Sequence, residues 1–131
     1  MLFAFFYTVF LPLESTATWL YCGFLIYLFG MFFDITAVLN LATSPKDKVI
    51  TGGLYRFSRN PMYIGMLLMH IGLGVASASW LYIVLALILI FLLNAFVSVE
   101  ESYCLHRYGD DYLKYKEKTP RWIGFPKSEE K

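Results

Sequence analysis

Two arginines and an amide stand directly before a long stretch of the chain that contains no Asp, Glu, Lys or Arg. The cluster consists of Arg56, Arg59 and Asn60. The uncharged stretch covers residues 61–99 and ends at the acidic pair Glu100-Glu101. Guanidinium groups hold carboxylates or phosphates through paired hydrogen bonds, and carboxylates at a membrane boundary usually have a partner or a function. If the uncharged stretch folds back on itself, both groups reach the same membrane face and form a polar ligand site.

Each basic residue of this cluster also has a structural interpretation. Arg56 suits lipid headgroup anchoring as well as it suits a ligand. Arg59, which adjoins Asn60-Pro61, favours a ligand or a structural clamp over headgroup anchoring. Tyr55 and Tyr63 provide hydroxyl donors or an aromatic face for a nucleobase, although tyrosines of the interfacial belt are the ordinary alternative.

The two glutamates cannot both face the same partner if the segment is helical. Adjacent residues on an α-helix point about 100° apart. One of Glu100 and Glu101 is therefore expected to accept hydrogen bonds from a ligand while the other pairs with an arginine. A purely structural salt bridge remains an alternative for the pair.

Composition predicts a membrane protein. Hydrophobic residues make up 58% of the 131 residues and charged residues only 16%, against roughly a quarter in soluble domains. All eleven Lys and Arg lie in the blocks 46–59 and 107–131, which are too short and sparse for a nucleic-acid groove. Cys22 and Cys104 have no metal-ligand spacing and are interpreted as packing residues. No metal and no nucleic acid is expected as a partner.

The pattern of apolar runs predicts an all-α, polytopic membrane bundle. A span of about 20 apolar residues fits 18–41, and a helical hairpin fits 62–77 and 80–99, with small turn-forming residues between its arms. The run 2–13 is predicted as a partial span. The tail 100–131 continues as a helical segment with amphipathic spacing up to Lys118, broken at Gly109. With no linker or repeat, residues 1–131 are expected to form a single domain.

The positive-inside rule predicts the orientation. The loop 42–60 and the C-terminal tail carry the Lys and Arg residues and are expected to be cytoplasmic. Both polar clusters would then lie at the cytosolic face. A compact protein of this kind suits a prokaryotic inner membrane.

Two motifs together resemble a known superfamily. The first is Gly53-Leu54-Tyr55-Arg56 continuing through Ser58-Arg59-Asn60-Pro61-Met62-Tyr63-Ile64-Gly65. The second follows the hairpin and contains Glu100-Glu101, Leu105, Tyr108-Gly109, Tyr112, Tyr115 and Pro120-Arg121-Trp122. This order resembles the isoprenylcysteine carboxyl methyltransferase and phospholipid methyltransferase superfamily over about residues 46–124.

The resemblance implies an integral membrane enzyme that binds S-adenosylmethionine on its cytosolic side. Its acceptor would be a lipophilic substrate from the bilayer, either isoprenylcysteine carboxylate-like or phospholipid-like, with membrane lipids as its surroundings. The implied catalytic residues are Arg59 and Asn60. The implied cofactor-binding residues are Tyr55, Tyr63, Gly65, Glu100, Glu101, Tyr112 and Arg121. Asn60 stands where the carboxyl methyltransferases usually have His, and this departure leaves the chemical group of the acceptor open.

Two other functions fit part of the pattern. The C-terminal part of a membrane sterol or steroid reductase, which would bind NADPH, has related motifs but favours a different sequence after the proline than Met62-Tyr63-Ile64-Gly65. A non-enzymatic membrane assembly protein would use the small residues between Gly72 and Ala78 as a close-packing face. That alternative gives no reason for the clustered arginines and glutamates.

Overall fold

The computed structural model describes residues 17–127, and all regular elements of this part of the chain are helices. They are α2 (Ala17–Thr43), the short 3-10 helix η1 (Gly53–Arg56), α3 (Pro61–Ala76), α4 (Trp80–Tyr108) and α5 (Asp110–Lys118). The predicted all-helical membrane bundle is confirmed. The partial span predicted at 2–13 lies outside the described residues.

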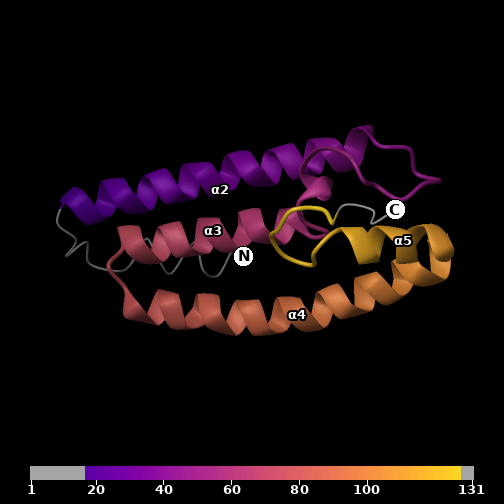
Figure 1. Ribbon diagram of the computed structural model, residues 1–131. Helices are drawn as coiled ribbons and strands as arrows, with labels where there is room; N and C mark the ends of the chain where they lie inside the picture. Colours follow the sequence, from indigo (N-terminus) through magenta and orange to yellow (C-terminus); the bar gives the residue numbers. More distant parts are fainter. Residues whose placement is uncertain (1–16, 128–131) are drawn as a thin grey trace.

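The three long helices form one layer, in which α3 lies between α2 and α4 (Figure 1). By length and composition, α2 and α4 can each cross a membrane. With 16 residues, α3 is shorter, about 24 Å at 1.5 Å per residue. The polar loop after α2 and the segment that contains α5 lie at the same end of this layer. The side of the membrane on which this end lies remains a prediction.

The fourth helix joins the predicted membrane arm and the first part of the predicted helical tail into one element. The expected arm 80–99 matches the start of α4, but the helix continues past Glu100 and Glu101 to Tyr108. The acidic pair therefore marks a membrane boundary within a helix, because a helix needs no break where its side chains change from apolar to charged.

The predicted hairpin turn and the predicted helix break at Gly109 are both confirmed. Between α3 and α4 the chain turns at Ser77 to Ser79, and Ala78 takes a positive φ of 46°. After α4, Gly109 has φ 54° and ψ −127°, a backbone conformation that favours glycine. This residue ends α4 and starts α5, so that α5 folds back beside the end of α4 (Figure 1).

Glycines bring α2 and α3 into backbone contact. A Cβ atom added to Gly72 would lie 2.5 Å from the backbone nitrogen of Tyr27 and 2.7 Å from the carbonyl oxygen of Gly23. One added to Gly65 would lie 2.7 Å from the backbone nitrogen of Asp34. Small residues at such contacts allow close van der Waals packing between membrane helices. The register of α3 against α2, and with it the position of the loop before Pro61, is fixed by this packing.

The small residues of α3 are thus engaged within the chain. Gly72 packs on α2, and Gly74 faces α4, where an added Cβ would lie 3.5 Å from side-chain atoms of Tyr82 and Ile83. This arrangement removes two members of the close-packing face that a membrane assembly protein would present to a partner.

The helix contact can be tested with Gly72→Ala. We expect the variant to lower the free energy of unfolding by about 1–3 kcal/mol, since the added methyl overpacks a backbone contact, and to lower the midpoint of thermal unfolding in detergent. The control is Gly52→Ala, because no atom of the described residues lies within 4 Å of a Cβ added to Gly52 and its φ is −93°. Equal midpoints for the two variants would contradict the packing.

Candidate active site

A C-terminal strap, defined here as residues 119–125, is hydrogen-bonded to the loop before α3. The backbone N–H of Arg59 donates to the carbonyl of Pro120 at 3.0 Å, and that of Gly124 donates to the carbonyl of Phe57 at 3.0 Å. The side-chain amide of Asn60 donates to the carbonyl of Arg121 at 3.1 Å. Segments about 60 residues apart in the sequence therefore form one unit at the end of the bundle.

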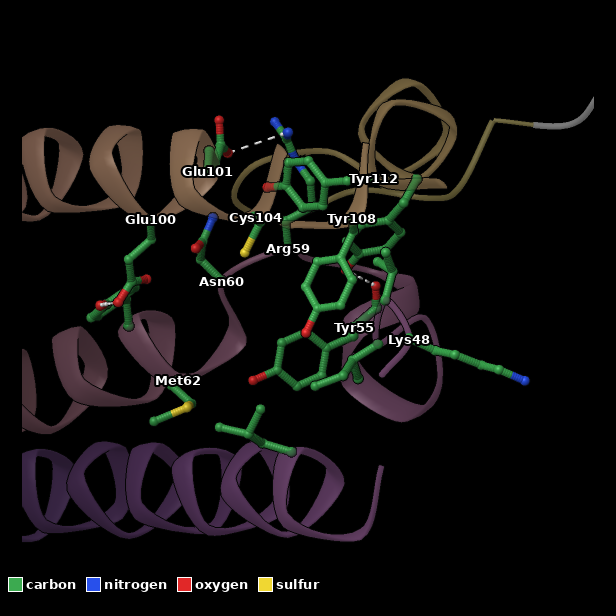
Figure 2. A pocket seen from close by; sticks show the side chains of 15 residues that line it. Lys48, Tyr55, Arg59, Asn60, Met62, Glu100, Glu101, Cys104, Tyr108 and Tyr112 are labelled. Carbon is green, nitrogen blue, oxygen red and sulfur yellow. Dashed lines mark hydrogen bonds and ion pairs between the residues drawn. The ribbon is translucent and has the colours of Figure 1, made fainter. Parts of the chain in front are cut away.

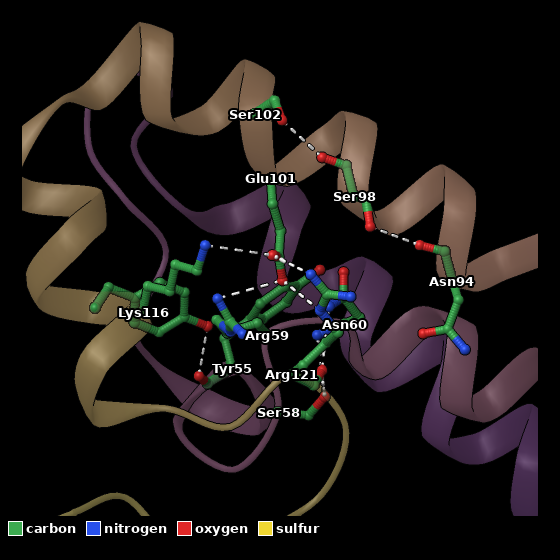
Figure 3. A network of polar contacts seen from close by, with 11 residues as sticks. Tyr55, Ser58, Arg59, Asn60, Asn94, Ser98, Glu101, Ser102, Lys116 and Arg121 are labelled. Carbon is green, nitrogen blue, oxygen red and sulfur yellow. Dashed lines mark hydrogen bonds and ion pairs between the residues drawn. The ribbon is translucent and has the colours of Figure 1, made fainter.

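The carboxylate of Glu101 joins this unit to α4 and α5. One oxygen lies 2.7 Å from Arg121 Nη2 and the other lies 3.2 Å from Arg59 Nη1. The ammonium of Lys116, on α5, lies 3.9 Å away. Glu101 is only 5% exposed, so its charge depends on these cations for compensation. Figure 3 shows the three basic side chains converging on it.

The neighbouring Glu100 has a different environment. Its carboxylate is exposed and accepts a hydrogen bond from the hydroxyl of Tyr63 at 2.8 Å. Figure 2 shows it directed towards α3, whereas Glu101 points to Arg59. Within the described part of the chain, Glu100 forms no ion pair with Lys or Arg. The predicted pairing of one glutamate with an arginine is what the geometry shows for Glu101. That the other glutamate binds a ligand stays a prediction.

A cavity of about 340 Å³ opens between these elements, a size within the usual range of small-molecule sites. Figure 2 shows the side chains around it. The polar and aromatic residues of its wall are Lys48, Tyr55, Arg59, Asn60, Tyr63, Glu100, Glu101, Tyr108, Tyr112 and Tyr115. The remaining lining residues are Leu41, Val49, Ile50, Met62 and Cys104.

All but two of the residues that the resemblance implied line this cavity. Gly65 does not, because it packs against Asp34 of α2. Arg121 does not line it either, and instead holds Glu101 from the strap. Arg59 and Asn60 are brought to the acidic pair, as the uncharged hairpin predicted, whereas Arg56 is exposed and does not line the cavity.

Several lining residues were not predicted as site residues. Tyr108 and Tyr115 belong to the amphipathic stripe of the tail, so the helical spacing of the sequence could have indicated that they face inwards. Val49 and Ile50 form a short apolar pair inside a polar loop, a weaker signal. Lys48 also lines the cavity, but Figure 2 shows its ammonium extending away from the other side chains.

The guanidinium of Arg59 is buried and only partly satisfied. Its side chain is 8% exposed, with Nη1 in the ion pair with Glu101. Among the described residues, neither its Nε nor its Nη1 has a hydrogen-bond partner, although Nη1 is in the ion pair. A buried donor without a partner costs free energy. Since Arg59 lines the cavity, an acceptor atom of a bound ligand could supply the missing bond.

Tyrosines form the other wall. Tyr55, Tyr112 and Tyr115 make a buried cluster, in which the Tyr115 hydroxyl donates to the carbonyl of Tyr55 at 2.7 Å. Burial raises the pKa of Tyr55 and of Tyr112 to about 12, with further contributions from Glu100 and Glu101 respectively. Burial also raises the pKa of Tyr115. These hydroxyls are neutral hydrogen-bond donors at neutral pH.

Comparison with known proteins decides the family. Residues 18–111 match the family described as phospholipid methyltransferase. This chain belongs to that family. It is a membrane protein, as its apolar helices and its relatives indicate.

The curated relatives carry a narrower name. The chain is 28% identical to a protein-S-isoprenylcysteine O-methyltransferase of Xenopus laevis, over 92% of this chain and 46% of the relative. It is also 28% identical to the Schizosaccharomyces pombe protein of the same name, over 64% of this chain and 37% of the relative. An uncharacterized protein of Haemophilus influenzae is 36% identical over 47% of this chain and all of its own length. No solved structure gives a significant match.

This chain spans less than half the length of the two named methyltransferases. The match nevertheless covers α2, α3 and all of α4. Most of the cavity described above therefore lies within the region that defines the family.

The role of Glu101 can be tested with Glu101→Gln. Removing one member of a buried ion pair leaves uncompensated charge and costs about 3–5 kcal/mol. We expect a lower midpoint of thermal unfolding and faster tryptic cleavage after Arg121, as the strap detaches. The control is Glu117→Gln on the exposed face of α5, which should behave as wild type. A cleavage rate unchanged by Glu101→Gln would contradict the claim that Glu101 holds the strap through Arg121.

The tyrosine cluster predicts a loss of stability at alkaline pH. The pKa of an unfolded tyrosine is near 10, whereas burial raises the pKa of folded Tyr55 and Tyr112 to about 12. Between these values the folded state binds more protons, so its stability is full below about pH 10 and falls as the pH rises. We expect Tyr112→Phe to reduce the slope of the unfolding midpoint against pH above about 10. An identical slope in wild type and variant would contradict the raised pKa of Tyr112.

Proposed function

We propose that this chain carries the S-adenosylmethionine site and the methyl-transfer site of an enzyme acting on a lipophilic acceptor in the membrane. The acceptor would be isoprenylcysteine carboxylate-like or phospholipid-like. The observation that supports this most is the cavity at the end of the apolar helices. Its wall combines a buried, partly unsatisfied guanidinium with the carboxylate of Glu100, which pairs with no Lys or Arg of residues 17–127.

The cavity offers partners for each part of the cofactor. S-adenosylmethionine carries a carboxylate, an ammonium, a sulfonium and an adenosine. The unpartnered Nε of Arg59 suits the carboxylate. The carboxylate of Glu100 suits the cationic groups, because nearby negative charge favours them. The tyrosine wall supplies aromatic faces and hydroxyl donors.

The bound cofactor would supply a methyl group on a sulfonium, which an acceptor displaces in line. The chain then has to align the two partners and keep water out, and such alignment can contribute about 7–11 kcal/mol. Glu101 holds Arg59 in one orientation, and the strap holds Asn60 in place. The apolar lining residues Leu41 and Met62 lie where a lipophilic acceptor would enter from the helices.

Asn60 would orient a bound group by hydrogen bonding and would not transfer a proton. Its side-chain N–H donates to the carbonyl of Arg121, which leaves its carbonyl oxygen as an acceptor towards the cavity it lines. A carboxamide does not titrate in the physiological range. If the acceptor carries a proton that must be removed, Glu100 is the cavity carboxylate free to receive it, because Glu101 is engaged by cations.

The two alternatives are less well supported. Membership of the phospholipid methyltransferase family favours methyl transfer over the NADPH chemistry of a sterol reductase. The packing of Gly72 and Gly74 within the chain argues against a free assembly face.

The binding proposal can be tested by calorimetry on the full chain in a membrane mimetic. We expect S-adenosylmethionine to bind wild type and NADPH not to bind. Glu100→Gln should weaken the affinity by about tenfold or more, corresponding to 1.4 kcal/mol or more, without a change in the midpoint of thermal unfolding. Glu117→Gln is the matched control. Unchanged affinity in Glu100→Gln would exclude the assignment of Glu100, and binding of NADPH alone would favour the reductase alternative.

A further inference from the structure

The strap and the loop before α3 expose three large apolar side chains, called the apolar patch here: Phe57 and Phe125, whose rings are in contact, and Ile123, two residues before Phe125. Ile123 is 73% exposed, Phe125 is 87% exposed and Phe57 is 43% exposed. We infer that this patch inserts into the lipid headgroup layer of the bilayer beside the cavity and holds the strap against the membrane.

Specific contacts hold Phe57 and Phe125 of the patch together. The rings of Phe57 and Phe125 pack edge to face, with centroids 6.3 Å apart and planes at 85°, a preferred arrangement for aromatic pairs. The hydrogen bond from Gly124 N–H to the Phe57 carbonyl fixes the backbone between them. Two segments far apart in the sequence thus place their apolar side chains together and leave them uncovered by the described chain.

The height of the patch along the bundle matches a membrane interface. Phe57 lies four residues before Pro61, where α3 begins. Since α3 is about 24 Å long and the hydrocarbon core is about 30 Å thick, the residues just before it lie near the boundary of that core. Aromatic side chains concentrate at this depth in membrane proteins.

The charges around the patch fit lipid headgroups. Arg56 precedes Phe57, Lys127 follows Phe125 by two residues, and both are exposed. Basic residues with apolar neighbours are typical of segments that lie in the interface, where the cations meet lipid phosphates.

A lipid occupant is favoured over a second copy of the chain. Stable protein interfaces involve about 20–30 residues on each side, and this patch has three. Its side chains are also apolar and exposed, like those on the surfaces of α2 and α4, which face lipid in a membrane protein. The inference rests on the membrane location of the chain and does not require the proposed methyl transfer.

The consequence is a strap held from two sides. Arg121 binds Glu101 on the inner side, while Ile123 and Phe125, next along the chain, contact lipid on the outer side. The wall around Asn60 would then keep a fixed depth relative to the leaflet from which a lipophilic molecule enters.

Depth-resolved fluorescence quenching tests this inference. The chain contains three Trp residues, so Trp19→Phe, Trp80→Phe and Trp122→Phe give a background without tryptophan. Phe125→Trp in this background, reconstituted in phosphatidylcholine vesicles, should be quenched strongly by lipids brominated near the headgroup end of the acyl chain. It should be quenched weakly by aqueous acrylamide. Glu117→Trp, on the exposed face of α5, is the matched control and should show the opposite ranking.

Two results would overturn the inference. Strong acrylamide quenching of Phe125→Trp without quenching by brominated lipid would place the patch in water. Protection from both quenchers would indicate that protein covers it. Ile123→Trp provides a second reporter with the same expectations, and circular dichroism of both variants establishes that the helices are intact before quenching is interpreted.

Discussion

The end of this molecule that carries the cavity depends on one buried carboxylate. Glu101 lies on α4 and binds Arg59 from the loop before α3, Arg121 from the strap and Lys116 from α5. Burying a charge costs several kcal/mol unless nearby cations and hydrogen bonds compensate it. The carboxylate therefore requires all these segments to meet, and their meeting creates the cavity wall.

This requirement separates the roles of the two adjacent glutamates. Glu101 lines the cavity, but its charge is already compensated by Arg59, Arg121 and Lys116. Glu100 points away from that network and accepts a hydrogen bond from the Tyr63 hydroxyl. Since no Lys or Arg in the described part of the chain pairs with it, Glu100 gives the cavity its negative charge. Arg59 is shared between the two functions, with one nitrogen in the network and its Nε without a partner.

Much of this arrangement was predictable because charge patterning in a membrane chain constrains topology. An uncharged stretch with small residues at its centre must reverse there, and this brought Arg59 and Glu100 to one end. Gly109 ended a helix because its positive φ excludes most other residues. The membrane arm and the helical tail were predicted separately, and α4 joins them without a break, since charged residues mark where a helix leaves the hydrocarbon core and not where its hydrogen bonds stop.

The sequence could not show which glutamate would face inwards. That choice depends on the rotation of α4 about its own axis, which is set by packing against α3. Nor could it show that Gly65 would serve helix packing, or that Arg121 would act from outside the cavity. Both residues fit the family motif equally well in a ligand role, and only the three-dimensional contacts distinguish the two.

Photochemical cross-linking of isotope-labelled S-adenosylmethionine, followed by peptide mapping, tests the central claim most directly. The account predicts label on peptides that contain the tyrosine wall, namely the regions around Tyr55 and from Tyr108 to Tyr115, and loss of that label when excess unlabelled cofactor is added. Competable label confined to the middle of α2 or α4, or no competable label in folded protein, would contradict it.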